Sequence, residues 1–306
     1  MAFIAILLRP PRPESRASGE LASAPADRAL RLPMTAGSVR FAVLGDAGRG
    51  DALQYETAAE LTRWHEQFPF GFVLMLGDNI YGPGTPEDFS LRFDRPYADL
   101  LARGVTFHAV VGNHDPPAIL SYPPLGMAGQ RYYTFEKSAG LPLAKTRAAF
   151  FALDTVRLDS DQLAWLDQTL QASTADWKIA FYHHPLYTSG QYRLRAQRTR
   201  WWLESLFVMG GVDVGFSGHE HFYERLRPQR GVQYFTSGAG GALRSGDIRS
   251  DSPVLAVGFD RDTHFVLVEI AGDTMHFQAV SRTGRTVDAG TMGSEAEERS
   301  PPRLRR

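Results

Sequence analysis

Short apolar runs that stop abruptly at Gly, Asp, Asn or His recur along the central part of the chain. The runs are rich in Val, Phe and Ile, and they cover residues 39–44, 70–76, 105–111, 177–182 and 212–216. Continuous apolar runs of this length are typical of strands that are buried on both faces, as in sheets covered by helices. The pattern therefore predicts five buried strands, each followed at once by a polar cluster.

Amphipathic segments lie between several of these strands. Residues 52–67 carry apolar side chains at loosely helical spacing, and Leu163, Leu166 and Leu170 fall on one face of a second predicted helix. Residues 196–208 form a third, with a wide apolar face. Alternation of strands and helices implies an α/β fold, and ligands in open α/β sheets bind at the carboxyl ends of the strands. All five polar clusters follow a predicted strand in this way.

The pattern changes after residue 230. Residues 231–237, 264–270 and 275–281 show more alternation and are joined by tight turns, which predicts antiparallel strands. We therefore expect an α/β fold of two packed mixed β-sheets flanked by helices, with βαβ units, in one domain that spans residues 37–291.

The two ends of the chain differ from this domain in composition. Residues 1–36 are rich in Ala, Ser, Pro and Arg and predict a mobile arm, and residues 292–306 predict a disordered charged tail. The apolar run at residues 2–8 is far shorter than the roughly 18 residues that a membrane-spanning helix needs, so we expect no transmembrane segment. It also makes a poor signal peptide, because no basic residue precedes it.

The amino-acid composition excludes several classes of protein and of functional site. Of the 306 residues, 43% are apolar and 22% are charged, which is ordinary for a globular protein and excludes wholesale disorder. The 33 basic and 34 acidic residues give a net charge of −1, which argues against nucleic acid as a stable partner. The chain has no cysteine, so disulfides, thiolate metal sites and a cysteine nucleophile are excluded. Metal or acid–base chemistry must depend on carboxylates and on the nine histidines.

Seven oxygen and nitrogen donors occupy the predicted strand ends: Asp46, Asp78, Tyr81, Asn113, His183, His219 and His221. Each alone has an ordinary structural explanation, such as a Gly-Asp turn or an asparagine that tolerates a left-handed turn. His219 and His221 lie two residues apart on a segment expected to be extended, so they should point to the same side. Five unrelated turns would not be expected to place acid, amide and imidazole groups in this order.

Carboxylates that share a crevice favour a bound cation, because like charges a few ångströms apart cannot both stay ionised cheaply. A donor set of carboxylates and imidazoles suits iron, zinc or manganese. Seven donors, with one of them bridging, would serve two metal ions. A pair of ions about 3.5–4 Å apart is the clamp used in in-line phosphoryl displacement.

The ordered clusters resemble the five motifs of the calcineurin-like metallophosphoesterases. They are Gly45-Asp46-Ala47-Gly48, Gly77-Asp78-Asn79-Ile80-Tyr81, Gly112-Asn113-His114-Asp115, His183-His184-Pro185 and Gly218-His219-Glu220-His221. The tyrosine three residues after the second aspartate is more selective, and it is similar to that of the purple acid phosphatases. The resemblance runs from residue 38 to residue 285 and is to the compact, single-domain type.

The resemblance implies a role for each donor. A ferric ion would be held by Asp46, Tyr81 and His221. A divalent ion of iron, zinc or manganese would be held by Asn113, His183 and His219. The remaining donor, Asp78, would bridge the two ions.

The resemblance also implies residues that act on the substrate. His114 would protonate or stabilise the leaving oxygen, and Asp115 would orient it. Many family members carry a substrate-contacting histidine nine residues after the position of His183, where this chain has Tyr192. Tyr192 would supply a hydroxyl group and Arg193 a charge-assisted contact to phosphate. The alternative is that residues 193–200 form the solvated start of a helix.

The function implied by the resemblance is a dinuclear-metal phosphoester hydrolase. It would be an acid phosphatase that acts on small phosphomonoesters by in-line attack of a metal hydroxide. One alternative is a phosphodiesterase on the same metal core, and another is a scaffold that binds metal or phosphate without catalysis. The resemblance, and nothing in the N-terminal sequence, favours an exported or periplasmic location. The sequence does not specify the oligomeric state.

Overall fold

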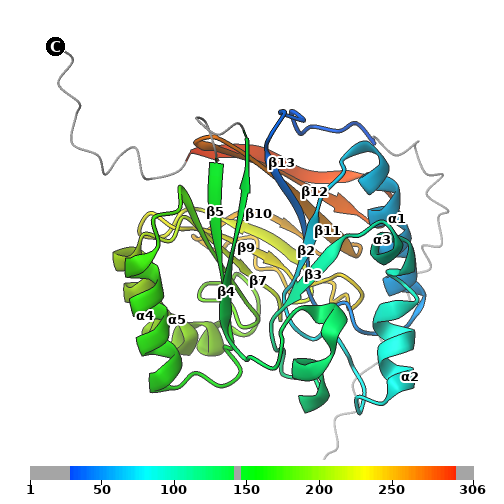
Figure 1. Ribbon diagram of the computed structural model, residues 1–306, viewed down its shortest axis with the longest axis horizontal. Helices are drawn as coiled ribbons and strands as arrows, with labels where there is room; N and C mark the ends of the chain where they lie inside the picture. The colour runs from blue at the N-terminus through cyan, green and yellow to red at the C-terminus, as the bar shows by residue number, and fades with distance from the viewer. Residues whose placement is uncertain (1–27, 141–145, 294–306) are drawn as a thin grey trace, which may run out of the picture.

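The computed structural model describes residues 28–140 and 146–293, which form two β-sheets packed together between two groups of helices (Figure 1). The first sheet has the strand order β13-β12-β11-β1-β2-β3, and the second has the order β10-β8-β9-β7-β6-β5-β4. The fold predicted from the sequence, two mixed sheets flanked by helices, is confirmed.

The first sheet is built from six strands: β1 (Val39–Leu44), β2 (Phe72–Met75), β3 (Thr106–Ala109), β11 (His264–Ala271), β12 (Thr274–Ser281) and β13 (Thr286–Gly293). Strands β1, β2 and β3 are parallel to one another. β11 pairs antiparallel with β1, β12 with β11, and β13 with β12. The parallel strands carry their carboxyl ends to one edge of the sheet.

The second sheet is built from seven strands: β4 (Tyr133–Ala139), β5 (Thr146–Leu153), β6 (Trp177–Tyr182), β7 (Val214–Ser217), β8 (Tyr223–Leu226), β9 (Gln233–Ser237) and β10 (Leu255–Phe259). Strands β5, β6, β7 and β9 are parallel. The antiparallel pairing expected for residues 231–237 holds for β9 against β8, but β9 pairs in parallel with β7 on its other side. The sequence of β9 does not distinguish these two neighbours, because both faces of the strand are buried.

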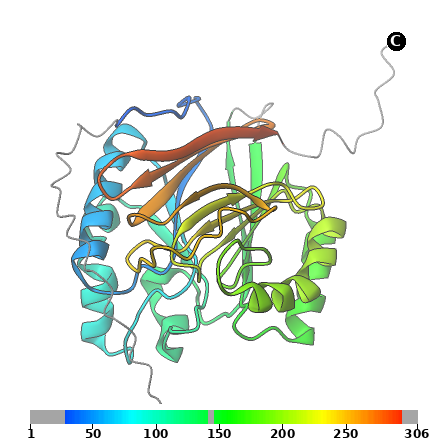
Figure 2. The same cartoon turned by 180° about the vertical axis from the view of Figure 1, so that it is seen from behind.

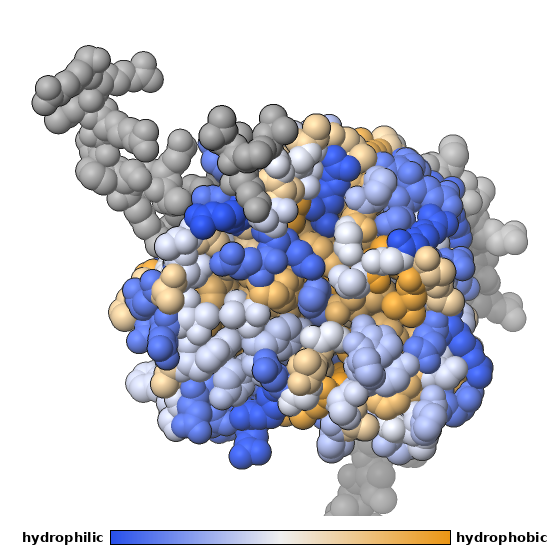
Figure 3. Space-filling view, viewed as in Figure 1, coloured by the Kyte–Doolittle hydropathy of each residue, from blue (hydrophilic) through white to orange (hydrophobic). Residues whose placement is uncertain are grey.

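Helices cover the outer faces of both sheets. In Figure 1, α1 (Ala52–Gln67) and α3 (Ala98–Ala102) lie beside the first sheet, whereas α4 (Ser160–Ala172) and α5 (Arg193–Gly210) lie beside the second. The short α2 (Pro86–Phe89) continues into a π-helical turn at Ser90–Asp94. Among the described residues, no helix combines the length and the apolar character needed to span a bilayer. Hydrophilic residues predominate on the face drawn in Figure 3, with smaller apolar patches among them.

Aromatic side chains fill the space between the two sheets. Phe41 on β1 stacks on Phe72 of β2 with ring centroids 5.2 Å apart, and both rings meet the edge of Phe150 on β5 at 5.3 Å. Phe135 on β4 stacks on Phe150 at 4.9 Å. Such pairs add about 0.5–1.5 kcal/mol each beyond the burial of their area. They fix the two sheets against each other, and with them the loops at the strand ends.

The last nine residues of the segment predicted as an N-terminal arm, 28–36, are described and are anchored to the first sheet. The backbone N–H groups of Met34 and Thr35 donate to the buried carboxylate of Glu269 at 2.9 and 2.5 Å. The backbone N–H of Arg31 donates to Gln278 at 2.9 Å. Residues 1–27 of that arm and residues 294–306 of the expected tail lie outside the described residues.

Candidate metal centre

The seven candidate ligands come together where the carboxyl ends of the two sheets meet. Asp46 follows β1, Asp78 and Tyr81 follow β2, and Asn113 follows β3, all in the first sheet. His183 follows β6 in the second sheet, and the loop after β7 supplies His219 and His221. Contacts cross between the sheets: the backbone N–H of His219 donates to Asp46 at 2.8 Å.

One group of donors consists of Asp46, Asp78, Tyr81 and His221. The Tyr81 hydroxyl donates to Asp78 at 3.0 Å, and it lies 3.5 Å from Asp46 Oδ1 and 3.4 Å from His221 Nε2. His221 Nε2 lies 3.3 Å from Asp46 Oδ1. Ligand atoms of Asp46, Asp78 and His221 all lie within 4.8 Å of one another, so a single ion can contact these three residues.

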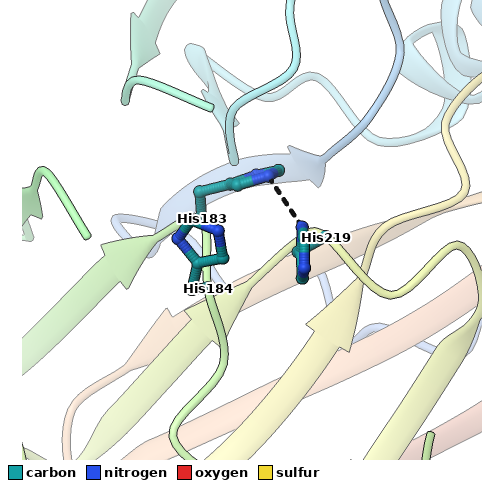
Figure 4. A group of neighbouring side chains, drawn as sticks. All are labelled: His183, His184 and His219. Atoms are coloured by element: carbon teal, nitrogen blue, oxygen red, sulfur yellow. Dashed lines mark hydrogen bonds between the residues drawn. The ribbon is translucent and has the colours of Figure 1, made fainter. Parts of the chain in front are cut away.

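A second group consists of Asn113, His183 and His219. His183 Nε2 lies 3.0 Å from Asn113 Oδ1, 3.2 Å from His219 Nδ1 and 3.5 Å from Asp78 Oδ1. Figure 4 shows His183 and His219 turned toward each other from two neighbouring strand ends. The other ring nitrogen of His183 donates to the Leu76 carbonyl at 2.9 Å, which leaves Nε2 with a free lone pair. Asp78 thus contacts members of both groups.

His184 was not singled out by the sequence, although it lies close to this second group. Its ligand atom lies within 4.8 Å of those of His183 and His219, and its ring is 4.4 Å from that of His219 (Figure 4). However, Nδ1 of His184 lies 3.1 Å from the Thr155 carbonyl. The hydroxyl of Thr155 also accepts a hydrogen bond from the backbone N–H of His184. These contacts join His184 to Thr155, with its ring packed edge-on against that of His219.

The backbone is strained at several candidate ligands. Six described residues other than glycine have positive φ, and Asp46, Asp78 and His219 are three of them, with φ of 54°, 52° and 70°. This region costs about 1–3 kcal/mol for each such residue, and it persists where the surrounding structure imposes it, often at functional sites. Because the backbone of His219 is in the left-handed region, the segment from His219 to His221 is not extended as expected. The His219 imidazole lies beside His183, and the His221 imidazole lies beside Asp46.

Glycines allow the loops to approach the ligands closely. A Cβ atom on Gly112 would overlap the backbone nitrogen and the carboxylate of Asp78, and one on Gly218 would lie 2.5 Å from Asp46 Oδ2. Both contacts are shorter than real Cβ atoms make. These two glycines are thus required by the packing of one ligand loop on another.

Burial and mutual repulsion set the protonation of the donors. Burial raises the pKa of Asp46 well above its usual value, and the neighbouring Asp78 raises it further, whereas His183 lowers it. Burial, together with Asp46 and Asp78, raises the pKa of Tyr81 far above that of a free phenol. Burial lowers the pKa of His219 to about 2 and that of His221 to about 4, so both imidazoles are neutral. Neutral imidazole is the form that binds a metal.

This donor set fits a pair of metal ions. Two buried carboxylates, a phenol and three imidazoles converge here. Within the described part of the chain, no cationic side chain donates a hydrogen bond to either carboxylate. Nearby negative groups disfavour the ionised forms of Asp46 and Tyr81, and a bound cation reverses that effect. Nitrogen and oxygen donors of this kind suit iron, zinc and manganese.

His114 and Asp115 lie on the same loop but face different surroundings. His114 is exposed, its backbone N–H donates to Asp78 at 2.8 Å, and its ring lies 5.1 Å from that of Tyr81. The Asp115 carboxylate accepts from the backbone N–H groups of Asn79, Ile80 and Gly112 and from the Asn79 side chain, at 2.7–2.8 Å. Burial and Asp78 raise the pKa of Asp115 to about 8, against these hydrogen bonds. Asp115 joins two ligand loops, and its four contacts do not involve the His114 imidazole.

Tyr192 and Arg193, the two expected substrate contacts, are placed differently. The Tyr192 ring lies 4.5 Å from the ring of His219, at the edge of the second donor group. Arg193 lines a cleft of about 380 Å³ in which none of the seven candidate ligands takes part. The structure therefore brings Tyr192 to the centre and directs Arg193 elsewhere.

Arg244 lies close to the donor groups, although no sequence motif selected it. Its guanidinium lies 5.2 Å from the Tyr192 ring centroid, its backbone N–H donates to the His221 carbonyl at 3.0 Å, and its charge lowers the pKa of Asp46, His219 and His221. Arg244 follows the glycine-rich loop at 238–241, which packs on the Asp46 segment. A glycine-rich loop that ends in arginine is too common a pattern to identify such a residue.

Comparison with known proteins places this geometry among phosphoesterases. The sequence model of the calcineurin-like phosphoesterases matches residues 39–223. Human tartrate-resistant acid phosphatase type 5 is 27% identical over 252 residues, which cover 70% of this chain and 77% of that protein. Purple acid phosphatase 17 of Arabidopsis thaliana is 28% identical over 242 residues, which cover 69% of this chain and 71% of that protein.

Solved structures share the fold. GAP50, the anchor in the inner membrane complex of Plasmodium, superposes with a TM-score of 0.73 at 19% identity, covering 84% of this chain and 89% of that one. The purple acid phosphatase PPD1 from yellow lupin seeds gives a TM-score of 0.66 at 18% identity, covering 85% of this chain and 54% of the lupin chain.

Proposed function

The chain belongs to the calcineurin-like phosphoesterase family, and from this premise we propose that it is an acid phosphatase that hydrolyses small phosphomonoesters at a dinuclear metal centre. The observation that carries the proposal is the position of Asp78. Its carboxylate lies 3.0 Å from the Tyr81 hydroxyl in one donor group and 3.5 Å from His183 Nε2 in the other. A carboxylate between two donor groups is suited to bridge two ions.

The two ions would be held by the two donor groups. We assign a ferric ion to Asp46, Tyr81 and His221, and a divalent ion of iron, zinc or manganese to Asn113, His183 and His219, with Asp78 between them. When bound, such ions supply Lewis acidity, which lowers the pKa of a coordinated water to about 7 and neutralises phosphate charge.

The remaining residues of the centre would bind and protonate the substrate. The exposed members, Asn113, His114 and Tyr192, mark the open side of the centre. The exposed imidazole of His114 would donate a proton to the leaving oxygen, because imidazole is suited to general-acid work near neutral pH and below. Arg244, whose charge acts on both donor groups, would stabilise a phosphate dianion.

The proposed function predicts a preference for monoesters. A monoester dianion carries one more negative charge toward the two cations and Arg244 than a diester does. We expect the metal-loaded protein to hydrolyse p-nitrophenyl phosphate at least about tenfold faster, in kcat/KM, than bis(p-nitrophenyl) phosphate, a difference of about 1.4 kcal/mol. Assays between pH 4 and 9, with metal content measured on the same sample, test this.

Either of two results would contradict the proposal. A reversed preference would identify a phosphodiesterase, and no turnover of either ester by protein that holds two ions per chain would identify a non-catalytic scaffold. The matched control is the same protein after chelation, which should lose activity on both esters and recover it when metal is restored.

Tyr81→Phe tests the assignment of the ferric ion. Because a phenolate bound to ferric iron absorbs visible light, we expect the iron-loaded protein to be coloured and the variant to lose this band. The fold should be preserved, since the lost hydroxyl makes one hydrogen bond shorter than 3.4 Å, worth about 1 kcal/mol. An absorption spectrum and a thermal melt measure both.

The matched control for this substitution is Tyr133→Phe. Tyr133 is buried, and its hydroxyl donates to the Ala109 carbonyl at 2.8 Å, away from the donor groups. This control should keep the visible band. An unchanged spectrum in Tyr81→Phe would remove Tyr81 from the iron site.

A further inference from the structure

The outer face of α5 exposes large apolar side chains in a line. Leu194, Trp201 and Met209 are 84%, 83% and 67% exposed, and their spacing of seven and eight residues places them on one side of the helix. Arg198 and Ser205 lie between them on the same side. We call these five residues the α5 face. It extends for about 22 Å along the helix, because each residue adds 1.5 Å.

Positive charge surrounds the α5 face. The helix carries four arginines and one glutamate, a net charge of +3. Among the described residues, no carboxylate pairs with Arg193 or Arg198, whereas the single acidic residue, Glu204, is occupied by Arg230 at 3.2 Å and by the Tyr187 hydroxyl. The apolar side chains and the unpaired cations therefore occur together on one helix.

A cleft beside the helix brings two of these arginines together with Arg249, which pairs with Asp251 at 3.4 Å. It has a volume of about 380 Å³, and Arg193 and Arg200 of α5 and Arg249 of a neighbouring loop line it together with neutral residues only. The α5 helix, yellow-green at the right of Figure 2, lies on the outer side of the second sheet. A phosphate group in this cleft would meet guanidinium groups without a competing acidic side chain in its lining.

We propose that the α5 face docks on a membrane surface rich in anionic phospholipid. Tryptophan and leucine on a helix with basic flanks are suited to the boundary between lipid head groups and acyl chains. The arginines would be attracted to the negative surface, and the cleft would accept a lipid phosphate. A second copy of the chain fits this face less well, because two faces of like charge would repel each other. RNA would leave Leu194 and Met209 without an apolar partner.

The experiment is sedimentation of the metal-loaded protein with lipid vesicles. Vesicles contain either phosphatidylcholine alone or phosphatidylcholine with about 30% phosphatidylglycerol, at 50 and 300 mM salt. We expect binding to the anionic vesicles that weakens at high salt, since the Debye length shortens from about 14 Å to about 6 Å. Leu194→Ala/Trp201→Ala should reduce the bound fraction at least fivefold, and Arg198→Glu should act in the same direction. Hydrolysis of p-nitrophenyl phosphate should not change in these variants.

Arg103→Ala is the matched control for charge. Arg103 follows α3 on the first sheet, is part-exposed and pairs with Glu66 at 3.3 Å, so its loss should not alter vesicle binding. Three results would overturn the proposal: no binding to anionic vesicles, equal binding by the double variant, or a dimer in sedimentation velocity that Trp201→Ala dissociates. Binding of free phosphate or single-stranded RNA at the same residues, with no vesicle binding, would also overturn it.

Discussion

Asp78→Asn is expected to remove both metal ions and to lower phosphatase turnover by about 10³-fold or more. The carboxylate contacts both donor groups, so replacing one of its oxygens by an amide nitrogen deprives each ion of an anionic ligand at once. Loss of metal removes several kcal/mol of transition-state stabilisation, and each 1.4 kcal/mol corresponds to a factor of ten. Metal analysis of the purified variant and its kcat on p-nitrophenyl phosphate give the two readouts.

Asp154→Asn is the control that separates this effect from the loss of any buried carboxylate. Asp154 is 2% exposed and accepts from Arg131 at 2.7 Å, outside the donor groups. It should lose stability and retain two ions per chain. If Asp78→Asn also retains both ions, the bridging assignment is wrong.

The sequence predicted β1, β2, β3, β6 and β7, because each is an apolar run that stops at a polar cluster. The runs at 39–44 and 177–182 match β1 and β6 residue for residue. It missed β4, β5, β8, β10 and β13, and β5 shows that a buried parallel strand can also be missed when no polar cluster of this kind marks its end. In β4 exposed and partly buried residues alternate after Tyr133, and β13 contains two glycines and has no fully buried residue. Their pairing is set by neighbours distant in the sequence, so local apolar pattern carries little information about them.

The sequence also located the candidate ligands, because each directly follows a strand that is easy to identify. It could not assign the groups that act around them. Arg244 and His184 reach the centre through loop geometry, in contact with Tyr192 and with Thr155. The left-handed backbone at His219 is a further feature that side-chain type alone does not predict.

The hydrogen bonds of Asp115 also depend on loop geometry that the sequence does not predict. Substitution of Asp115 has the second large effect that we expect. The resemblance suggested that Asp115 orients His114, whereas its carboxylate accepts four hydrogen bonds that hold the loop of Asn79 and Ile80 against Gly112. In Asp115→Asn, one side-chain oxygen becomes an N–H donor that faces other donors. Each buried donor left without a partner costs about 1–3 kcal/mol, so we expect unfolding to become easier by about 2–4 kcal/mol. The bound metal should decrease as well, because Asp78 and Tyr81 flank the same loop.

His114→Ala is the comparison that separates the two roles. Its imidazole is exposed, so the substitution should lower turnover and leave the urea midpoint and the metal content close to the parent values. If Asp115 acted through His114, Asp115→Asn would behave in the same way, with a loss of kcat at unchanged stability. If it acts as the contact between two ligand loops, the urea midpoint and the metal content should fall together. Urea unfolding and metal analysis of the two variants, side by side, decide between these outcomes.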